Sequence, residues 1–223
     1  MNKFTIEDIN KKPNMELTAD NIVKVDAKFY QKLRKDEDFL RDFLRENPTN
    51  VNPDIIYRKI RLIDLLNSTR LDNHPGFAEF LANKICGITD IDDLIRFGDP
   101  KAVDLIALEN DNFCGVPSFA SKYCYYHQIY CYDRNDYPIY DMNVRKMLLR
   151  YISKRGLRTF MDNLFTDSDI ENPYAEFKKI IEKTLSLYEI KAKNKEFNGR
   201  AFSMFDHFMW YTYKFGEEST KDE

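Results

Sequence analysis

The chain is divided into apolar segments of helical period by residues that stop helices. In segment 20–46, large apolar residues such as Phe39, Leu40, Phe43 and Leu44 recur at spacings of three and four. Glu46-Asn47-Pro48 ends that segment, and similar Pro or Gly signals separate those that follow. Two-residue alternation over several strands is not found. The pattern predicts an all-α domain of about ten helices.

The expected helices follow from these boundaries. They cover 20–46, 54–71, 77–86, 90–97, 101–110, a stretch beginning near 118, 142–154, 156–165, 174–193 and 200–215. Asn52 is a candidate cap before Pro53, and Asp99-Pro100 caps and starts the helix from Lys101. We expect a loosely held N-terminal arm over 1–20, one domain over 21–216 and a frayed acidic tail over 217–223.

Composition excludes several classes of protein. The 223 residues are 43% hydrophobic and 14% aromatic, which argues against disorder. The chain has no apolar run of membrane-spanning length and no apolar signal-peptide core near its first residue, so we expect a cytoplasmic protein with no membrane partner. The net charge of −3 does not by itself indicate a nucleic-acid binder. In that setting the four cysteines are expected to be reduced thiols: Cys86, Cys114, Cys124 and Cys131.

One segment carries a candidate catalytic pair. Residues 99–122 predict a helix, a loop with Gly115 and Pro117, and a second helix whose first turns contain Lys122. Asp141 follows Lys122 by nineteen residues. This is a helix-hairpin-helix outline, in which backbone N–H groups at a helix N-terminus can meet a phosphate. The alternative is an ordinary surface lysine with an unrelated aspartate.

Residues 99–150 resemble the helix-hairpin-helix (HhH-GPD) DNA glycosylase superfamily, and in particular the compact microbial proteins of the 8-oxoguanine DNA glycosylase-like fold. Residues 117–122, PSFASK, lie over the family's Pro-Gly-Val-Gly-x-Lys. Asp141 falls at its catalytic aspartate, and Asn143 falls where several members have a histidine. Ser118 and Ala120 replace the two hairpin glycines. The resemblance implies an all-α fold of two helical lobes with a cleft, whose helix-hairpin-helix spans about 99–132.

The resemblance also implies an activity. The protein would be a DNA glycosylase with associated lyase activity, acting on double-stranded DNA that contains an oxidised or otherwise modified base, 8-oxoguanine first. Lys122 would be the nucleophile, through a Schiff base, and Asp141 would stabilise positive charge on the sugar. The enzyme would be a monomer without a cofactor. A hypermodified base of foreign DNA is a second substrate class.

A basic stretch follows the catalytic segment. Lys146, Arg150 and Lys154 lie four residues apart on one helical face, and no acidic residue occurs from 142 through 161. We interpret it as a phosphate-contacting stripe, with a solvated helix face as the alternative. The residues predicted to contact DNA are Gly115, Ser118, Ala120, Ser121, Asn143, Arg145, Lys146, Arg150 and Lys154.

The base pocket is predicted from two further helices. The family lines part of its pocket from a late helix, so we expect Phe202, Asp206 and Trp210 there, with core packing as the alternative for Phe202 and Trp210. Asn67 and Ser68 reach the pocket or cap the end of their helix. Seven tyrosines lie in 123–140; Tyr126 is the one assigned to the pocket, because an aromatic ring can stack on a base.

Cys124, His127 and Cys131 have spacings that suggest a zinc site with Cys114 as a fourth ligand. We favour buried thiols and a hydrogen-bonded histidine, and predict no metal. Two rival functions also stay open. One is a non-catalytic DNA-binding or interaction module that keeps the fold, and it predicts an exposed Lys122. The other is a helical protein with no nucleic-acid partner.

Overall fold

A computed structural model describes residues 13, 15–69, 71, 75–107, 116–152, 156–190, 197 and 199–215, without the side chains of 29–36. Every regular element in these residues is a helix, which confirms the predicted all-α class. The helices are α2 (Ala19–Glu46), α3 (Pro53–Asn67), α4 (Phe77–Cys86), α5 (Ile91–Phe97), α6 (Lys101–Ala107), α7 (Pro117–Tyr132), α8 (Met142–Tyr151), α9 (Leu157–Asn163), α10 (Pro173–Leu187) and α11 (Ala201–Phe215). Gly115, Cys114, Lys154 and the tail 217–223 lie outside the described residues.

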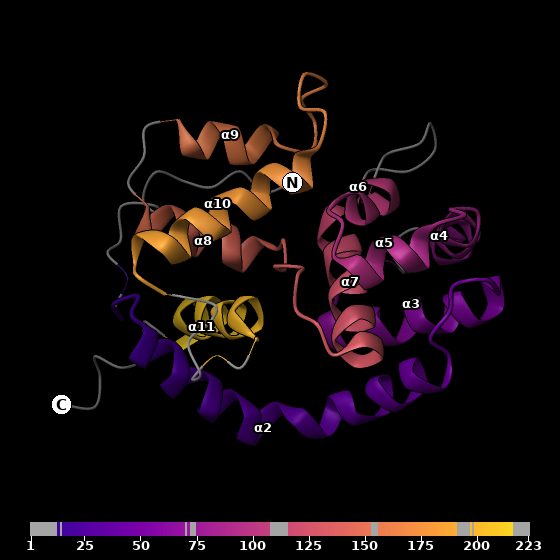
Figure 1. Cartoon of the computed structure of the whole chain (residues 1–223), viewed down its shortest axis with the longest axis horizontal. Coiled ribbons are helices and arrows are strands. Elements are labelled where there is room, and N and C mark those ends of the chain that lie inside the picture. The colour runs from indigo at the N-terminus through magenta and orange to yellow at the C-terminus, as the bar shows by residue number, and fades with distance from the viewer. Residues whose placement is uncertain are drawn as a thin grey trace.

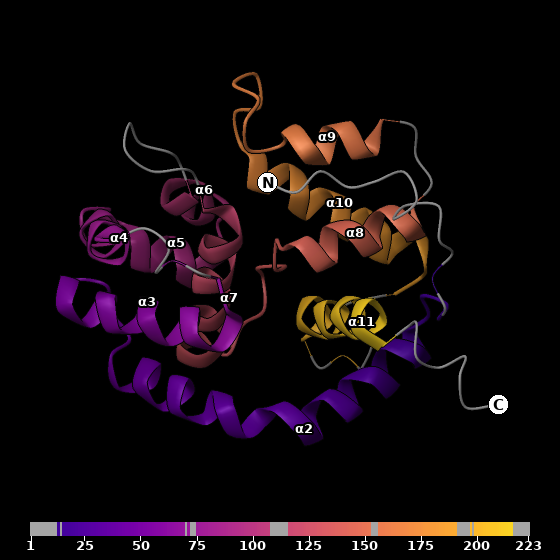
Figure 2. The ribbon, with the colours of Figure 1, turned by 180° about the vertical axis from the view of Figure 1, so that it is seen from behind.

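The helices are arranged in two groups. α3 to α7 lie together on one side, and α8 to α11 lie on the other (Figure 1). The long helix α2 runs along both groups, packing against α3 and α7 in the first and α11 in the second. The view from behind shows the same arrangement (Figure 2). Further contact between the groups comes from α10, which packs on α6.

Caps explain why the helices begin where they do. The Asn52 side chain accepts from the backbone N–H groups of Asp54 and Ile55, as predicted, with Pro53 in the first turn. The predicted cap Asp99 accepts from the N–H of Lys101 at 2.9 Å. Asp141 is the N-cap of α8 and accepts from the N–H of Val144 at 2.9 Å.

Three predicted boundaries are wrong. The predicted arm is too long, because Leu17 is buried and the Tyr151 hydroxyl donates to the Met15 carbonyl at 2.6 Å. α3 ends four residues early because Ser68 has a left-handed φ of 50°. α10 ends at Leu187 instead of 193 because the N–H of the buried Ile190 donates to the Leu185 carbonyl, which turns the chain back onto the core.

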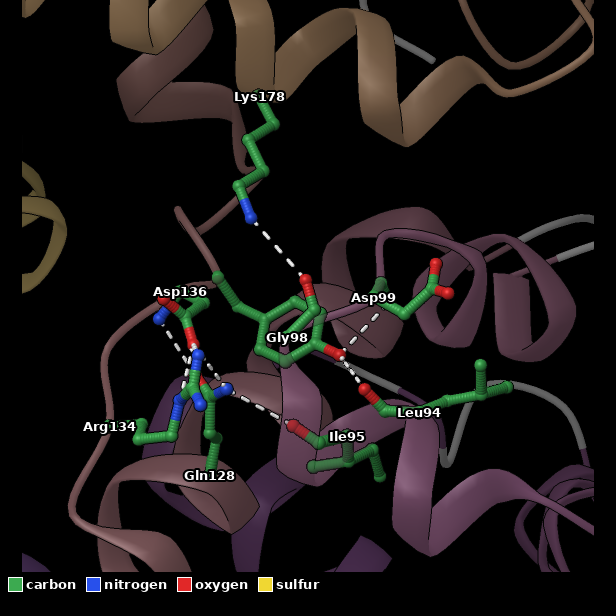
Figure 3. A network of polar contacts seen from close by, with 9 residues as sticks. Leu94, Ile95, Gly98, Asp99, Gln128, Arg134, Asp136 and Lys178 are labelled. Atoms are coloured by element: carbon green, nitrogen blue, oxygen red, sulfur yellow. Dashed lines mark hydrogen bonds and ion pairs between the residues drawn. The ribbon is translucent and has the colours of Figure 1, made fainter.

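An extended segment, residues 133–141, leads from the end of α7 to the start of α8. Its polar side chains are held by α7 and α5 (Figure 3). Gln128 of α7 donates to the Ile95 carbonyl at 3.1 Å and to the Asp136 carboxylate at 2.9 Å. It also accepts from the Asp136 N–H at 2.7 Å, and Arg134 donates to the same carboxylate at 2.8 Å. One interior glutamine therefore fixes the register of the segment.

Two buried tyrosines complete the attachment. The Tyr137 hydroxyl donates to the carbonyls of Leu94 at 2.9 Å and Asp99 at 3.0 Å, next to the end of α5 (Figure 3). The Tyr174 hydroxyl, from α10, donates to the Pro138 carbonyl at 2.6 Å. The segment is thus bonded to both groups of helices.

Gly98, the C-cap of α5, lies close against this segment. Its φ is 74°, and a Cβ there would lie 2.5 Å from the Asp136 Cβ. Lys178 of α10 donates to the Gly98 carbonyl at 3.4 Å (Figure 3). A side chain at this position would push the segment away from α5.

We predict that Gly98→Ala lowers the free energy of unfolding by about 2 kcal/mol or more, since left-handed strain and overpacking add. Gly156→Ala is the matched control: its φ is 83°, but a Cβ there meets nothing within 4 Å. The free energy of unfolding of this control should fall by about 1 kcal/mol, from backbone strain alone. Urea denaturation followed by circular dichroism measures both variants; equal losses would contradict the close approach.

Candidate functional site

Lys122 and Asp141 lie together between the two groups of helices. Lys122 is in α7, and its side chain is 8% exposed. Its Nζ lies 3.5 Å from Oδ2 of Asp141, whose side chain is 17% exposed. The other carboxylate oxygen of Asp141 caps α8, so the backbone fixes the orientation of this carboxylate.

Two serines of α7 lie beside this pair. Lys122 Nζ donates to the Ser118 hydroxyl at 3.1 Å. The Ser121 hydroxyl accepts from the N–H of Tyr140 at 3.0 Å, which ties the residue before Asp141 to α7. The pair is therefore positioned by α7 on one side and by the segment 133–141 on the other.

A further carboxyl group, that of Asp206, interacts with the pair. Burial raises the pKa of Asp206, in α11, well above its ordinary value, and the neighbouring Asp141 and Glu37 raise it further, while Lys122 lowers it. The residue is partly exposed, but its carboxyl is desolvated. Burial and the neighbouring carboxyl groups therefore favour the protonated form of Asp206.

Glu37 of α2 is the residue that the sequence analysis missed. Its carboxylate accepts from the Tyr130 hydroxyl at 2.6 Å and from the Tyr126 hydroxyl at 3.5 Å. Tyr126 also lies within 3.4 Å of the Asn67 side chain, so the predicted pocket residues Tyr126 and Asn67 meet. Glu37 is one acid among many in a polar stretch of α2, and no motif or spacing distinguishes it.

Three other predicted pocket residues have the following surroundings. Ser68 is exposed at the end of α3. Phe202 packs against the hydrophobic core, as the alternative held. The Trp210 ring lies 5.8 Å from the ring of Phe215. A hollow of about 420 Å³ between α2 and α3 is lined, among the side chains that the structure describes, by apolar residues that were not predicted to form a site: Phe39, Leu40, Leu62, Leu65 and Leu66.

Three of the residues predicted to contact DNA are buried in the interior of the protein. Ala120 and Ser121 have no exposed surface, and the N–H of Ala120 donates to the Val116 carbonyl at 2.9 Å. Arg145 is buried and donates to Asp162 at 2.8 Å and to the Met161 carbonyl at 3.3 Å. The prediction of direct DNA contact was therefore wrong for Ala120, Ser121 and Arg145, because α7 and α8 turn these side chains inward.

The rest of the basic stripe is nearer the surface. Asn143, Lys146 and Arg150 are all partly exposed on α8. Lys146 donates to the Tyr213 hydroxyl at 3.3 Å and lies 5.3 Å from the centre of that ring. Arg150 lies 3.7 Å from the Met147 sulfur. Lys154, the last predicted member, is outside the described residues.

Comparison with known proteins places part of this site within one family. The family model HI_0787_N, described as an N-terminal domain, matches residues 14–134, just over half of the chain. The chain belongs to the HI_0787_N family. The matched part contains α2 to α7 and therefore Lys122 and Glu37, whereas Asp141 and Asp206 follow it. Searches of curated proteins and of solved structures found no match.

The histidine of the possible zinc cluster has other partners. In this member of the HI_0787_N family, the buried His127 Nε2 lies 3.1 Å from Lys59 Nζ and 3.2 Å from the Asn50 amide. Burial lowers the pKa of His127 well below its ordinary value, with a smaller contribution from Lys59. Among the described residues, which exclude Cys114, no group of three or more His, Cys, Asp or Glu side chains could hold a metal ion.

Within the described residues, no helix is long and apolar enough to cross a bilayer.

We predict that Asp206→Asn raises the free energy of unfolding by an amount that grows with pH. Because the pKa of Asp206 is raised in the folded protein, the native state favours its neutral form, and stability falls as pH rises above the ordinary value of 3.8. An amide resembles the neutral acid and does not ionise. Urea denaturation at several pH values from about 4 to 8 measures the difference in free energy of unfolding between the variant and the wild type. Asp93→Asn, on the exposed side of α5, is the control.

Proposed function

We propose that this protein is a DNA glycosylase with associated lyase activity, acting on double-stranded DNA that contains an oxidised or otherwise modified base. The observation that carries the proposal is a desolvated lysine, Lys122, held within ion-pair distance of Asp141. The two residues also occur at the spacing of the glycosylase family that residues 99–150 resemble. In this proposal the two groups of helices are the two lobes of that fold, with the DNA entering between them.

Lys122 would act as the nucleophile. Its neutral amine attacks C1′ of the nucleotide, the glycosidic bond breaks, and the electron pair leaves with the base, which takes up a proton. The adduct loses a proton from Nζ, and the C1′–O4′ bond then breaks as O4′ takes up a proton, which leaves an iminium between C1′ and Nζ. Loss of a proton from C2′ then allows elimination of the 3′ phosphate. The base must first leave the duplex stack. A lysine that is 8% exposed has little water around it, so few other nucleophiles compete.

The acids of the site would divide the remaining tasks. The carboxylate of Asp141 would stabilise positive charge on the sugar and accept protons. Asp206, whose raised pKa favours the protonated form, would donate a hydrogen bond to an acceptor on the base. Glu37, held by Tyr130, can accept one from an N–H of the base. These roles favour a base that offers both a donor and an acceptor, and 8-oxoguanine is the first candidate.

The DNA backbone would lie along α8. Asn143, Lys146 and Arg150 are partly exposed on this helix, which begins directly after Asp141. Local positive charge can bind phosphate although the chain carries a net charge of −3. We propose a monomer that acts on DNA in the cytoplasm.

The rival hypothesis, a non-catalytic DNA-binding module, predicts an exposed Lys122. The burial of Lys122 against Ser118 and Asp141 therefore supports the enzyme over the module.

We predict that the protein forms a covalent complex with a duplex carrying a modified base or an abasic site when borohydride is present. Borohydride reduces the iminium to a stable amine, which denaturing gel electrophoresis and mass spectrometry detect at Lys122. Lys122→Gln should abolish trapping and strand cleavage while DNA affinity stays within about twofold, because the amide keeps the length of the side chain but is not a nucleophile.

Lys179→Gln is the control, since this lysine is 57% exposed on α10. Absence of both base release and trapping across a broad panel of modified bases would exclude the enzyme. Trapping that persists in folded Lys122→Gln would exclude this lysine as the nucleophile.

We predict that Asp141→Asn lowers the single-turnover rate of base release about a hundredfold or more, because the sugar cation loses its counter-charge. Asparagine is as good an N-cap as aspartate, so α8 should keep its start and the melting temperature should change little. A rate that stays within threefold of the wild type would contradict the role of Asp141.

A further inference from the structure

The Lys122 side chain extends back along its own helix. Side chains of an α-helix lean toward its N-terminus, so the stem of residue 122 passes over residue 118, one turn earlier. The Lys122 Nζ lies 3.1 Å from the Ser118 hydroxyl, which is closer than its 3.5 Å to Asp141. Ser118 is therefore the nearest of the two polar partners of this amine.

We propose that Ser118 is a positioning residue for the Lys122 amine, holding it in place in both its charged and its neutral state. The inference rests on the proposed function, because it gives the nucleophile of that reaction its orientation. Ser118 was expected to contact DNA; its hydroxyl instead faces the lysine.

The two partners of the amine differ in chemistry. A carboxylate only accepts hydrogen bonds, and its attraction to the lysine weakens when the ammonium loses its proton. A hydroxyl is uncharged and can both accept and donate, so its bond to nitrogen does not depend on the charge of the amine. An N–H of the neutral amine therefore still donates to the Ser118 hydroxyl. With that N–H held, the lone pair of the nitrogen points away from α7, toward the side on which C1′ of the substrate would lie.

The neighbouring serine does not share this role. The Ser121 hydroxyl donates to the Ser118 carbonyl at 3.0 Å and accepts from the N–H of Tyr140 at 3.0 Å. Its hydrogen-bonding groups are thus used to hold α7 and the segment before Asp141. The glycine that the resembled family has at the position of Ser118 carries no hydroxyl, so this contact belongs to the present chain.

The first test needs no DNA. Lysine-selective ¹⁵N NMR measures how fast the Lys122 amine protons exchange with water in the wild type, Ser118→Ala and Ser118→Thr. We expect exchange at least several-fold faster in Ser118→Ala, and a rate close to the wild type in Ser118→Thr, which restores the hydroxyl. Ser186→Ala, at an exposed serine of α10, is the control. Equal exchange in all variants would overturn the inference.

The second test is borohydride trapping on a duplex with an abasic site. Hydrogen bonds to charged groups are worth enough for a tenfold to hundredfold effect, so the trapping rate at saturating DNA should fall by about that factor in Ser118→Ala. The DNA dissociation constant should stay within about twofold, and Ser118→Thr should recover most of the rate. A merely structural role would instead lower the melting temperature and DNA affinity together, and that result would overturn the inference.

The two tests separate the two proposals. If the exchange rates differ as expected but no duplex is trapped by the wild type, the glycosylase proposal fails and the serine contact stands. If the wild type is trapped and Ser118→Ala is trapped at the same rate, the glycosylase proposal stands and the positioning role of Ser118 fails.

Discussion

The hydrogen bonds that hold segment 133–141 determine how Asp141 meets Lys122. Gln128 pairs with Asp136 by both its amide oxygen and its amide nitrogen, which sets the register of the segment against α7. Because a buried polar group without a partner is costly, a shift of one residue would be strongly disfavoured. The same register brings Asp141 to Lys122 and places the start of α8.

Burial gives the lysines of this protein different environments. Lys59 is fully buried, and its Nζ donates to the Thr49 carbonyl and the Asn50 side chain, at 2.9 and 3.0 Å. Burial lowers the pKa of Lys59 to about 8, although Cys131 and Asp92 oppose this. Its partners all lie within the first group of helices, so we interpret Lys59 as a donor of hydrogen bonds to buried polar groups of the core. Lys122 differs because it interacts with carboxyl groups of the second group of helices, those of Asp141 at the start of α8 and Asp206 in α11.

Local signals in the sequence predicted the helices well, because Pro, Gly and capping side chains act over a few residues. The spacing between Lys122 and Asp141 identified two residues that the structure brings together. Glu37 could not be found in this way, since its contact with Tyr130 spans 93 positions of the chain. The sequence pattern also could not predict that Ala120 points inward. Because almost all of α7 is buried, no apolar stripe distinguishes its interior face.

The position of α2 across both groups has a consequence for how the chain folds. Ile22 and Val25, early in α2, are buried, and Asp26 accepts from His207 of α11 at 2.6 Å, a contact between residues 181 positions apart. Contacts of such long sequence separation form late, because the intervening chain must first be ordered. The apolar side chains in the first half of α2 are therefore buried only after α11 has packed against them. The part of the chain that matches the family model, residues 14–134, therefore does not include the helix that packs on the first half of α2.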